Sequence, residues 1–244
     1  MAVYYNQDVS YIIGGYEVAC NAKSATLATT VAPLDTTAVC TTSGYTTLIG
    51  GNKSGQFNLE LMADMATLGL DDFMWSYLST ADVVHQLSIG SADGSPAYLW
   101  RGITTNYTPI QGNPGELAMS SLSGQSSTGP VIRGQRIHPT SVARSATGNG
   151  TAYQLGAVVA GKSLYAALNV IARTGTASMT LKIQSDDNSG MSSPTDRITS
   201  FTAATGTGYQ WGSVAGAITD DYWRCVYTIT GTGTITFAVA AGII

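Results

Sequence analysis

Histidine is the side chain best suited to acid–base chemistry near neutral pH, and this 244-residue chain contains two, His85 and His138. His85 lies on the apolar side of an alternating stretch, which favours an imidazole packed in a core or an interface. His138 precedes Pro139 at the end of a predicted strand. The sequence has no Gly-x-Ser-x-Gly pattern to mark a nucleophile. We therefore expect no catalytic residue and no enzyme activity.

Oxygen ligands gather at Asp186-Asp187-Asn188-Ser189-Gly190, a spacing that invites comparison with calcium loops. Glycine occupies the place of the third ligand, and no glutamate closes the segment. We interpret Asp186 and Asp187 as a solvated turn, with calcium binding as the alternative, and Asp220-Asp221 in the same way. The Gly-x-Gly at Gly206–Gly208 is followed by no helix, so we expect no phosphate site and no cofactor there.

Carboxylate pairs and aromatic side chains are the other groups that could act on sugars. Glu60 and Glu116 could face each other across a cleft, but neither has a distinctive sequence context. Tyr209 and Trp211 flank Gln210 in a loop-like context, which makes them candidates for a surface platform that stacks on sugar rings. Trp223 is expected to pack inside the fold.

The three cysteines, Cys20, Cys40 and Cys225, are widely spaced and form no Cys-x-x-Cys motif, so no zinc or redox site is predicted. Cys20 and Cys40 could pair in an oxidising compartment. The start of the chain lacks the basic and apolar regions of a signal peptide, so we expect reduced thiols and folding in a bacterial cytoplasm. No apolar run reaches the length of a membrane helix, so we expect no membrane contact.

Charge is scarce and unevenly distributed along the chain. Charged residues make up 11% of the sequence, against about a quarter in a typical soluble domain. Residues 1–130 hold ten acids and three bases, a net charge of −7, whereas residues 131–244 hold five acids and eight bases, a net charge of +3. The first part therefore lacks the basic clusters of a DNA-binding surface. A surface this poor in charge suggests coverage by neighbouring subunits, or else a secreted threonine-rich β-sandwich.

Alternation of apolar and polar residues predicts strands through the first half of the chain. After a Gly-Gly-Asn-Lys-Ser-Gly break, the run Phe57–Met62 places Phe57, Leu59 and Leu61 on one side and Asn58 and Glu60 on the other. Asp71–Leu78 predicts a short helix with two aspartates at its start. Further strands are predicted at Val83–Ile89, Ala97–Tyr107 and Glu116–Leu122, and a long polar loop from Pro33 to Thr47.

The second half reads as strands joined by glycine-rich turns. A small, polar linker is predicted at Ser123–Pro130, and a hairpin at Gly231-Thr232-Gly233. The predicted strands are Val131–His138, Tyr153–Val159, Leu164–Arg173, Met179–Gln184, Ile198–Phe201, Tyr222–Thr230 and Ile235–Ala241. We therefore predict a mainly β protein with two domains, residues 1–125 with one short helix and residues 126–244 as a jelly-roll-like β-sandwich.

The order of features in residues 1–125 resembles a known family. The long polar segment LATTVAPLDTTAVCTTSGY is followed by Leu-Ile-Gly-Gly, the alternating strand, the short helix, a strand and a hairpin. This order resembles the N-terminal half of the tail tube proteins of long-tailed bacteriophages, in particular the major tail tube protein of siphovirus-type phages. The resemblance implies a β-barrel or β-sandwich fold for the first domain, with the second domain decorating the outside.

The resemblance also implies a role. Copies would form hexameric rings by joining their inner strands into one barrel, and the rings would stack into the virion's tail tube, a conduit for DNA. The partners would be further copies of the chain, a tape-measure protein and tail-end proteins, with DNA as transient cargo. An external domain would obstruct a sheath, which favours a non-contractile tail. Assembly would take place in the host cytoplasm.

Candidate residues follow from this picture. The channel should be polar and negative, with Asn58, Glu60, Gln86 and Ser88 as the candidates opposite the core face of the inner strands. The candidates for a loop that reaches the next ring are Leu34, Asp35, Thr36, Thr37, Thr41 and Thr42. The alternative function is a two-domain carbohydrate-binding or adhesin-type β-sandwich protein that uses Tyr209 and Trp211.

Overall fold

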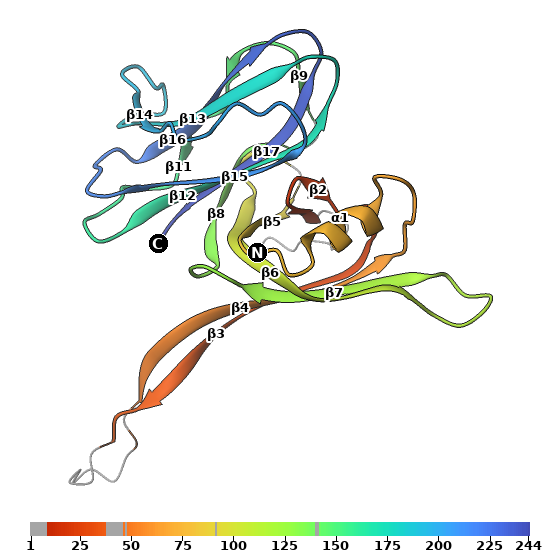
Figure 1. Cartoon of the computed structure of the whole chain (residues 1–244). Coiled ribbons are helices and arrows are strands. Elements are labelled where there is room, and N and C mark those ends of the chain that lie inside the picture. The colour runs from red at the N-terminus through yellow and green to blue at the C-terminus, as the bar shows by residue number, and fades with distance from the viewer. Residues whose placement is uncertain (1–8, 38–45, 47, 91, 140–141) are drawn as a thin grey trace.

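The computed structural model describes residues 9–37, 46, 48–90, 92–139 and 142–244. Within these residues the chain is mainly β, with a single helix and no closed barrel, so the predicted fold class is confirmed. Figure 1 shows two bodies of strands, with a long two-stranded ribbon that projects from the first half. One 12-stranded sheet and one 5-stranded sheet contain the strands.

The first half forms a curled antiparallel sheet in the order β3–β4–β7–β6–β5–β1–β2. Its core includes Phe57, Leu59 and Leu61, while Asn58 and Glu60 are exposed, so the predicted alternation is confirmed. The strands are β1 (Val9–Ile13), β2 (Tyr16–Glu17), β3 (Ala22–Asp35), β4 (Leu48–Met62), β5 (Val83–Ile89), β6 (Pro96–Gln111) and β7 (Met119–Ser126).

Two sequence predictions in this half were wrong because glycines and small polar residues are part of strands. The Gly-Gly-Asn-Lys-Ser-Gly segment is the middle of β4, where cross-strand pairing with β3 holds the backbone without large side chains. Residues 123–126 of the predicted linker belong to β7, paired with β4 and β6. At Gly55 a Cβ would lie 2.3 Å from Cγ2 of Val131, so only glycine permits this close approach.

Helix α1 (Leu70–Tyr77) agrees with the predicted Asp71–Leu78 to within one residue. Leu70 and Met74 are buried against the sheet, and this packing is what holds so short a helix. The Tyr77 hydroxyl donates to the carbonyl of Gly14 at 2.7 Å, and the Tyr107 hydroxyl donates to Asp71 at 2.8 Å. These bonds tie one end of the helix to the turn between β1 and β2 and the other end to β6.

The second half is a two-layer sandwich. One layer is the β15–β12–β17–β8 end of the large sheet, and the other is the sheet containing β10, β11, β16, β13 and β14. Apolar side chains fill the space between them, including Trp223, Phe237 and Ile183. The strands are β8 (Ile132–His138), β9 (Ala143–Arg144), β10 (Gly148–Asn149), β11 (Tyr153–Gln154), β12 (Ser163–Arg173), β13 (Ser178–Asp186), β14 (Thr195–Ile198), β15 (Gly208–Ala215), β16 (Tyr222–Thr230) and β17 (Ile235–Ile243).

The predicted hairpin at Gly231–Gly233 is wrong, because β16 and β17 lie in different layers. This turn crosses the sandwich, as does the turn between β12 and β13. The two crossings are zipped together: Thr174 and Thr176 bind Thr234 and Thr232 through backbone and hydroxyl groups. Hydrogen bonds between two arches thus close one end of the sandwich.

One sheet crosses the predicted division at residues 125 and 126, since β8 pairs with β6 on one side and with β17 on the other. A small apolar cluster lies between the two halves, formed by residues such as Leu99, Ala167 and Ala240. The second half is therefore joined to the first by a continuous backbone ladder as well as by side chains. The two-domain division itself stays a prediction.

Candidate assembly surface

The part of the sheet formed by β3, β4, β7 and β6 has one face on the core and the other in solvent. Cross-strand register places Ser24, Asn106 and Ser121 in rows with Asn58 and Glu60 on the solvent face. By register, the full set on that face is Ser24, Thr26, Ala28, Gln56, Asn58, Glu60, Met62, Ile103, Asn106, Thr108, Gln111, Met119, Ser121, Ser123 and Gln125, most of them polar. Glu60 is the single charged member of this set. We call it the polar face.

Of the predicted channel residues, Asn58 and Glu60 lie on the polar face and are exposed. Gln86 and Ser88 are fully buried. Asn169 donates to Gln86 Oε1 at 3.3 Å, and Gln86 donates to the Ser88 hydroxyl at 3.3 Å, so these side chains bond within the junction between the halves. The assumed division of β5 into a core side and an exposed side does not hold, because apolar residues cover both of its faces. The consecutive Val83 and Val84 were the sequence signal for a strand buried on both sides.

Two backbone edges of this four-stranded part have no strand beside them among the described residues. β3 pairs only with β4. β6 pairs with β5 only over residues 97–102, so from Asn106 to Gln111 its edge opposite β7 is open. The strands alternate in direction, so the two open edges run antiparallel to each other. Open edges of this kind are templates for pairing with another chain.

Beyond the polar face, the β3–β4 ribbon continues as what we call the arm, residues 29–35 and 48–54, which extends away from the body (Figure 1). Val31, Leu34, Leu48 and Ile49 are all about half exposed on it. Leu34 lies directly opposite Ile49. A two-stranded ribbon without a core is at best marginally stable alone, and the arm has no described element packed against it beyond its own two strands.

The predicted inter-ring residues fall at the end of the arm. Leu34, Asp35, Thr36 and Thr37 are exposed there, and Thr41 and Thr42 lie outside the described residues. The backbone N–H of Thr37 donates to Asp35 Oδ1 at 2.8 Å. Hydrogen bonds from Thr37 lower the pKa of Asp35, so this carboxylate is charged at neutral pH.

The two histidines are packed in the two cores. The His85 ring stacks on Trp100 with centroids 5.0 Å apart, and its Nδ1 shares a hydrogen bond of 3.0 Å with the Tyr11 hydroxyl. Burial lowers its pKa to about 3. His138 stacks on Phe237, and burial lowers its pKa to about 4. The interpretation of His85 as a packed imidazole is confirmed.

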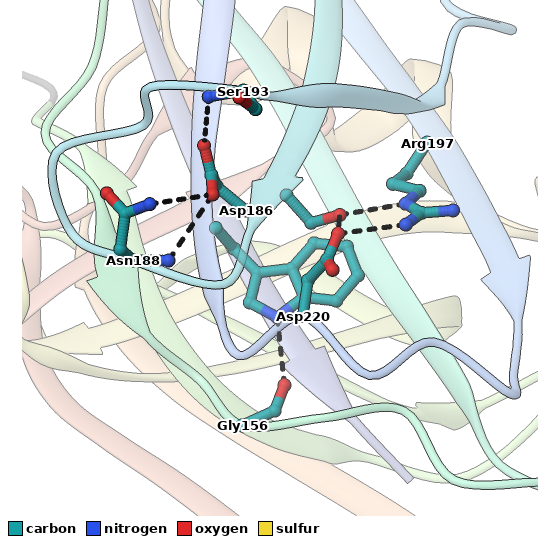
Figure 2. Close-up of polar contacts among 8 residues, drawn as sticks. Gly156, Asp186, Asn188, Ser193, Arg197 and Asp220 are labelled. Carbon is teal, nitrogen blue, oxygen red and sulfur yellow. Dashed lines mark hydrogen bonds and ion pairs between the residues drawn. The ribbon is translucent and has the colours of Figure 1, made fainter.

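The Asp186 turn lies at the end of the sandwich shown in Figure 2. Asp186 accepts hydrogen bonds from Asn188 and, at 2.8 Å, from the backbone N–H of Ser193. Nearby, Asp220 accepts from Ser185 at 2.6 Å and from Arg197 at 2.8 Å. The pKa of each of these two carboxyls is lowered, chiefly by the bonds from Ser193 and Ser185. Among the described residues, no group of three or more acids, histidines or cysteines could hold a metal ion.

The Trp223 indole Nε1–H donates to the carbonyl of Gly156 at 2.9 Å. Its ring is fully buried, so the expectation that it packs in the sandwich is confirmed. Cys225, two residues further along β16, is buried as well, and burial raises its thiol pKa to about 12. Cys20 is an exposed free thiol, and Cys40 lies outside the described residues.

The loop expected for Tyr209 and Trp211 is wrong, because both belong to β15, which pairs with β12. The Tyr209 ring meets Tyr77 of α1 edge-on at 6.1 Å between centroids. The ring centroids of Trp211 and Tyr165 are 5.8 Å apart. The guanidinium carbon of Arg101 lies 5.9 Å from the Trp211 ring centroid. Both rings are half-buried in contacts within the chain.

No helix among the described residues is long and apolar enough to cross a bilayer. No protein-family model and no curated protein matches the sequence. Solved structures align with the chain at low similarity. A chain from the virion of a native gene transfer agent particle is 14% identical with a TM-score of 0.45, covering 53% of this chain and 98% of that one.

Two further structures illustrate the range of these alignments. The tube-terminating cap of the anti-feeding prophage is 12% identical with a TM-score of 0.43, covering 55% of this chain and 95% of that one. The Dit protein of phage SPP1, described as a paradigm of the hub adsorption apparatus, is 12% identical with a TM-score of 0.36, covering 97% of this chain and 99% of that one. Similarity at this level does not assign a function, which has to come from the chain's own surfaces.

Proposed function

We propose that this chain is a structural subunit of a phage-type tail, in which copies close into rings and the rings stack into a tube that conducts DNA. The observation that carries the proposal is the four-stranded part with two open edges of opposite direction. A strand β6 beside a neighbour's β3 would continue the antiparallel order without a break. Repetition of this head-to-tail contact around an axis closes a ring and leaves no edge exposed.

The arm supplies the contact along the tube axis. β7 pairs with β4 only over residues 56–62, so the arm extends beyond the level at which neighbouring sheets would join. Its exposed Val31, Leu34 and Ile49 would be buried against the next ring. Burial of each such side chain contributes about 1.5–3 kcal/mol when complete. This would stabilise the ribbon that no core holds in the single chain.

The polar face would line the channel. Hydroxyl and amide groups with one carboxylate per copy, Glu60, present no cationic site for phosphates. The first part of the chain is acidic, with a net charge of −7 over residues 1–130. Repulsion between carboxylates and phosphates would let DNA pass without stalling. The sandwich, joined through β8, would lie outside the ring, which favours a tail without a sheath.

Negative-stain microscopy of the purified protein tests the proposal, with rings or hollow tubes of uniform width as the expected result. A shortened variant, in which Asn-Gly replaces residues 32–52 between the opposed Val31 and Lys53, removes the arm and keeps a tight hairpin. It should form rings that do not stack. A 25.3 kDa monomer at every concentration, with affinity for a glycan, would overturn the proposal in favour of the sugar-binding alternative.

A further inference from the structure

The curled sheet of the first half has a groove where its two ends approach each other. It lies between β1 and the start of β3 and has a volume of about 260 Å³. Its lining residues are Val9, Tyr11, Ala19, Ala22, Lys23, Ser24 and Ala25. β1 pairs with β2 only at Ile12 and Ile13, so no described strand fills the space beside Val9. The groove is therefore a small, mainly apolar recess with Lys23 exposed beside it.

The other end of the four-stranded part carries a matching protrusion. Two exposed apolar side chains lie there: Ile110 near the end of β6, 64% accessible, and Leu117 in the turn between β6 and β7, 55% accessible. Glu116 lies in the same turn, where its Oε2 accepts hydrogen bonds from the backbone and side-chain N–H groups of Asn113. These bonds hold the turn in one shape in the single chain. The turn presents apolar bulk and a negative charge, whereas the groove presents an apolar recess and a positive charge.

Register places this protrusion and the groove at the same level of the sheet. Ala22 opposes Leu61 on β4, and the next residue, Met62, opposes Met119 on β7. Met119 in turn opposes Gln111 on β6. The start of β3 and the end of β6 are thus level with each other at the two open edges. A copy that adds its β6 beside β3 at this level brings its Ile110 to the groove.

We infer that Ile110 of one copy seats in the groove between β1 and β3 of the next copy, with Glu116 facing that copy's Lys23. This contact rests on the proposed ring and specifies its register. Backbone pairing alone tolerates a slip along the strands, whereas a side chain in a recess does not. The contact would therefore select one ring geometry among the alternatives that edge pairing permits.

Disulfide trapping tests the inference in the full chain. One preparation carries Ile110→Cys and a second carries Ala25→Cys, both with Cys20→Ser and Cys40→Ser, and the two are mixed under assembly conditions and oxidised. A dimer band on a non-reducing gel is expected from the mixture and from neither preparation alone. The matched control replaces Ile110→Cys with Val159→Cys, a 54% accessible position in the sandwich, and should give no such band. Microscopy of each mixture records whether rings have formed.

Charge exchange gives a second measurement. Lys23→Glu and Glu116→Lys should each raise the concentration needed for ring formation about two- to fivefold, and the double exchange should restore it. Glu116→Gln keeps an oxygen that can accept from Asn113, so it separates loss of the charge from loss of the turn. Rings without the dimer band would overturn the inference and leave the proposed ring intact. Failure of the unsubstituted chain to assemble would overturn both.

Discussion

Both halves of this chain are built from antiparallel strands, but they differ in how much of their surface is covered within the chain. The sandwich encloses its core between two layers, and the threonines of its two arches bind each other at one end. The sheet of the first half keeps a polar face, two open edges and an arm without a core. The sandwich is thus complete as a single chain. The first half has open backbone edges and exposed apolar side chains that no other described part of the chain covers.

Truncation of a large apolar side chain in each region should give the largest difference in stability between the two halves. Trp223→Ala should cost about 3–5 kcal/mol of unfolding free energy, because it empties the centre of the sandwich. Leu34→Ala on the arm should change the unfolding free energy of the monomer by less than about 0.5 kcal/mol. Urea denaturation below the assembly concentration measures both. Equal losses would show that the arm is already packed within the single chain.

Acid should destabilise both halves through their buried histidines. The pKa values of His85, about 3, and His138, about 4, lie below the value near 6.5 of an unfolded chain. The folded state therefore binds fewer protons, and its stability falls as pH drops from about 6.5 towards 4. Each histidine contributes about 1.4 kcal/mol per pH unit within this window.

The measurement is the unfolding free energy by urea at pH 7.5, 6 and 5. His85→Phe keeps an aromatic ring beside Trp100 and removes one titrating group, so its loss of stability between pH 6 and 5 should be about half that of the parent chain. An unchanged slope would show that His85 is not the neutral core group described here. The comparison is made on the slope because the variant also loses the hydrogen bond to Tyr11.

Glycine substitutions should affect the end of the sandwich closed by the two arches more strongly than its open loops. Gly233 has φ of +119°, and a Cβ there would lie 2.1 Å from the carbonyl oxygen of Thr174 in the other arch. Gly156 has φ of +95°, and a Cβ there would meet no atom within 4 Å. Gly156→Ala should cost about 1–2 kcal/mol from backbone strain alone, and Gly233→Ala about twice as much. Thermal unfolding of the two variants measures the difference, and equal costs would argue against the zipped arches.

Elements whose side chains follow a regular local period could be predicted from the sequence. Helix α1 and strand β5 were located to within a residue, and the Phe57–Met62 alternation identified the end of the longer β4, since each follows a local period. It failed where tertiary contacts decide: Gln86 is buried because the sandwich covers the second face of β5. Residues 33–35 of the arm were predicted as part of a loop and residues 50–54 as part of a break, because they show no period, and these strands exist only by pairing with each other. The groove and the open β6 edge depend on register, which no local pattern reveals.

Charge substitutions on the polar face should have the smallest effect on folding and should change only DNA transfer. Asn58→Lys with Glu60→Lys adds positive charge to exposed positions, so tubes should still form. Transfer of DNA by particles built from this variant should fall, because lysines in a channel bind phosphates. The matched control, Thr228→Lys with Asp187→Lys, makes the same change in net charge at exposed positions on the sandwich and should leave transfer unchanged. Equal transfer of DNA by both variants would mean that the polar face does not line the channel. A loss of transfer in the Asn58 and Glu60 variant alone would mean that one face of the β3–β4–β7–β6 sheet packs on the core and the other lines the DNA channel.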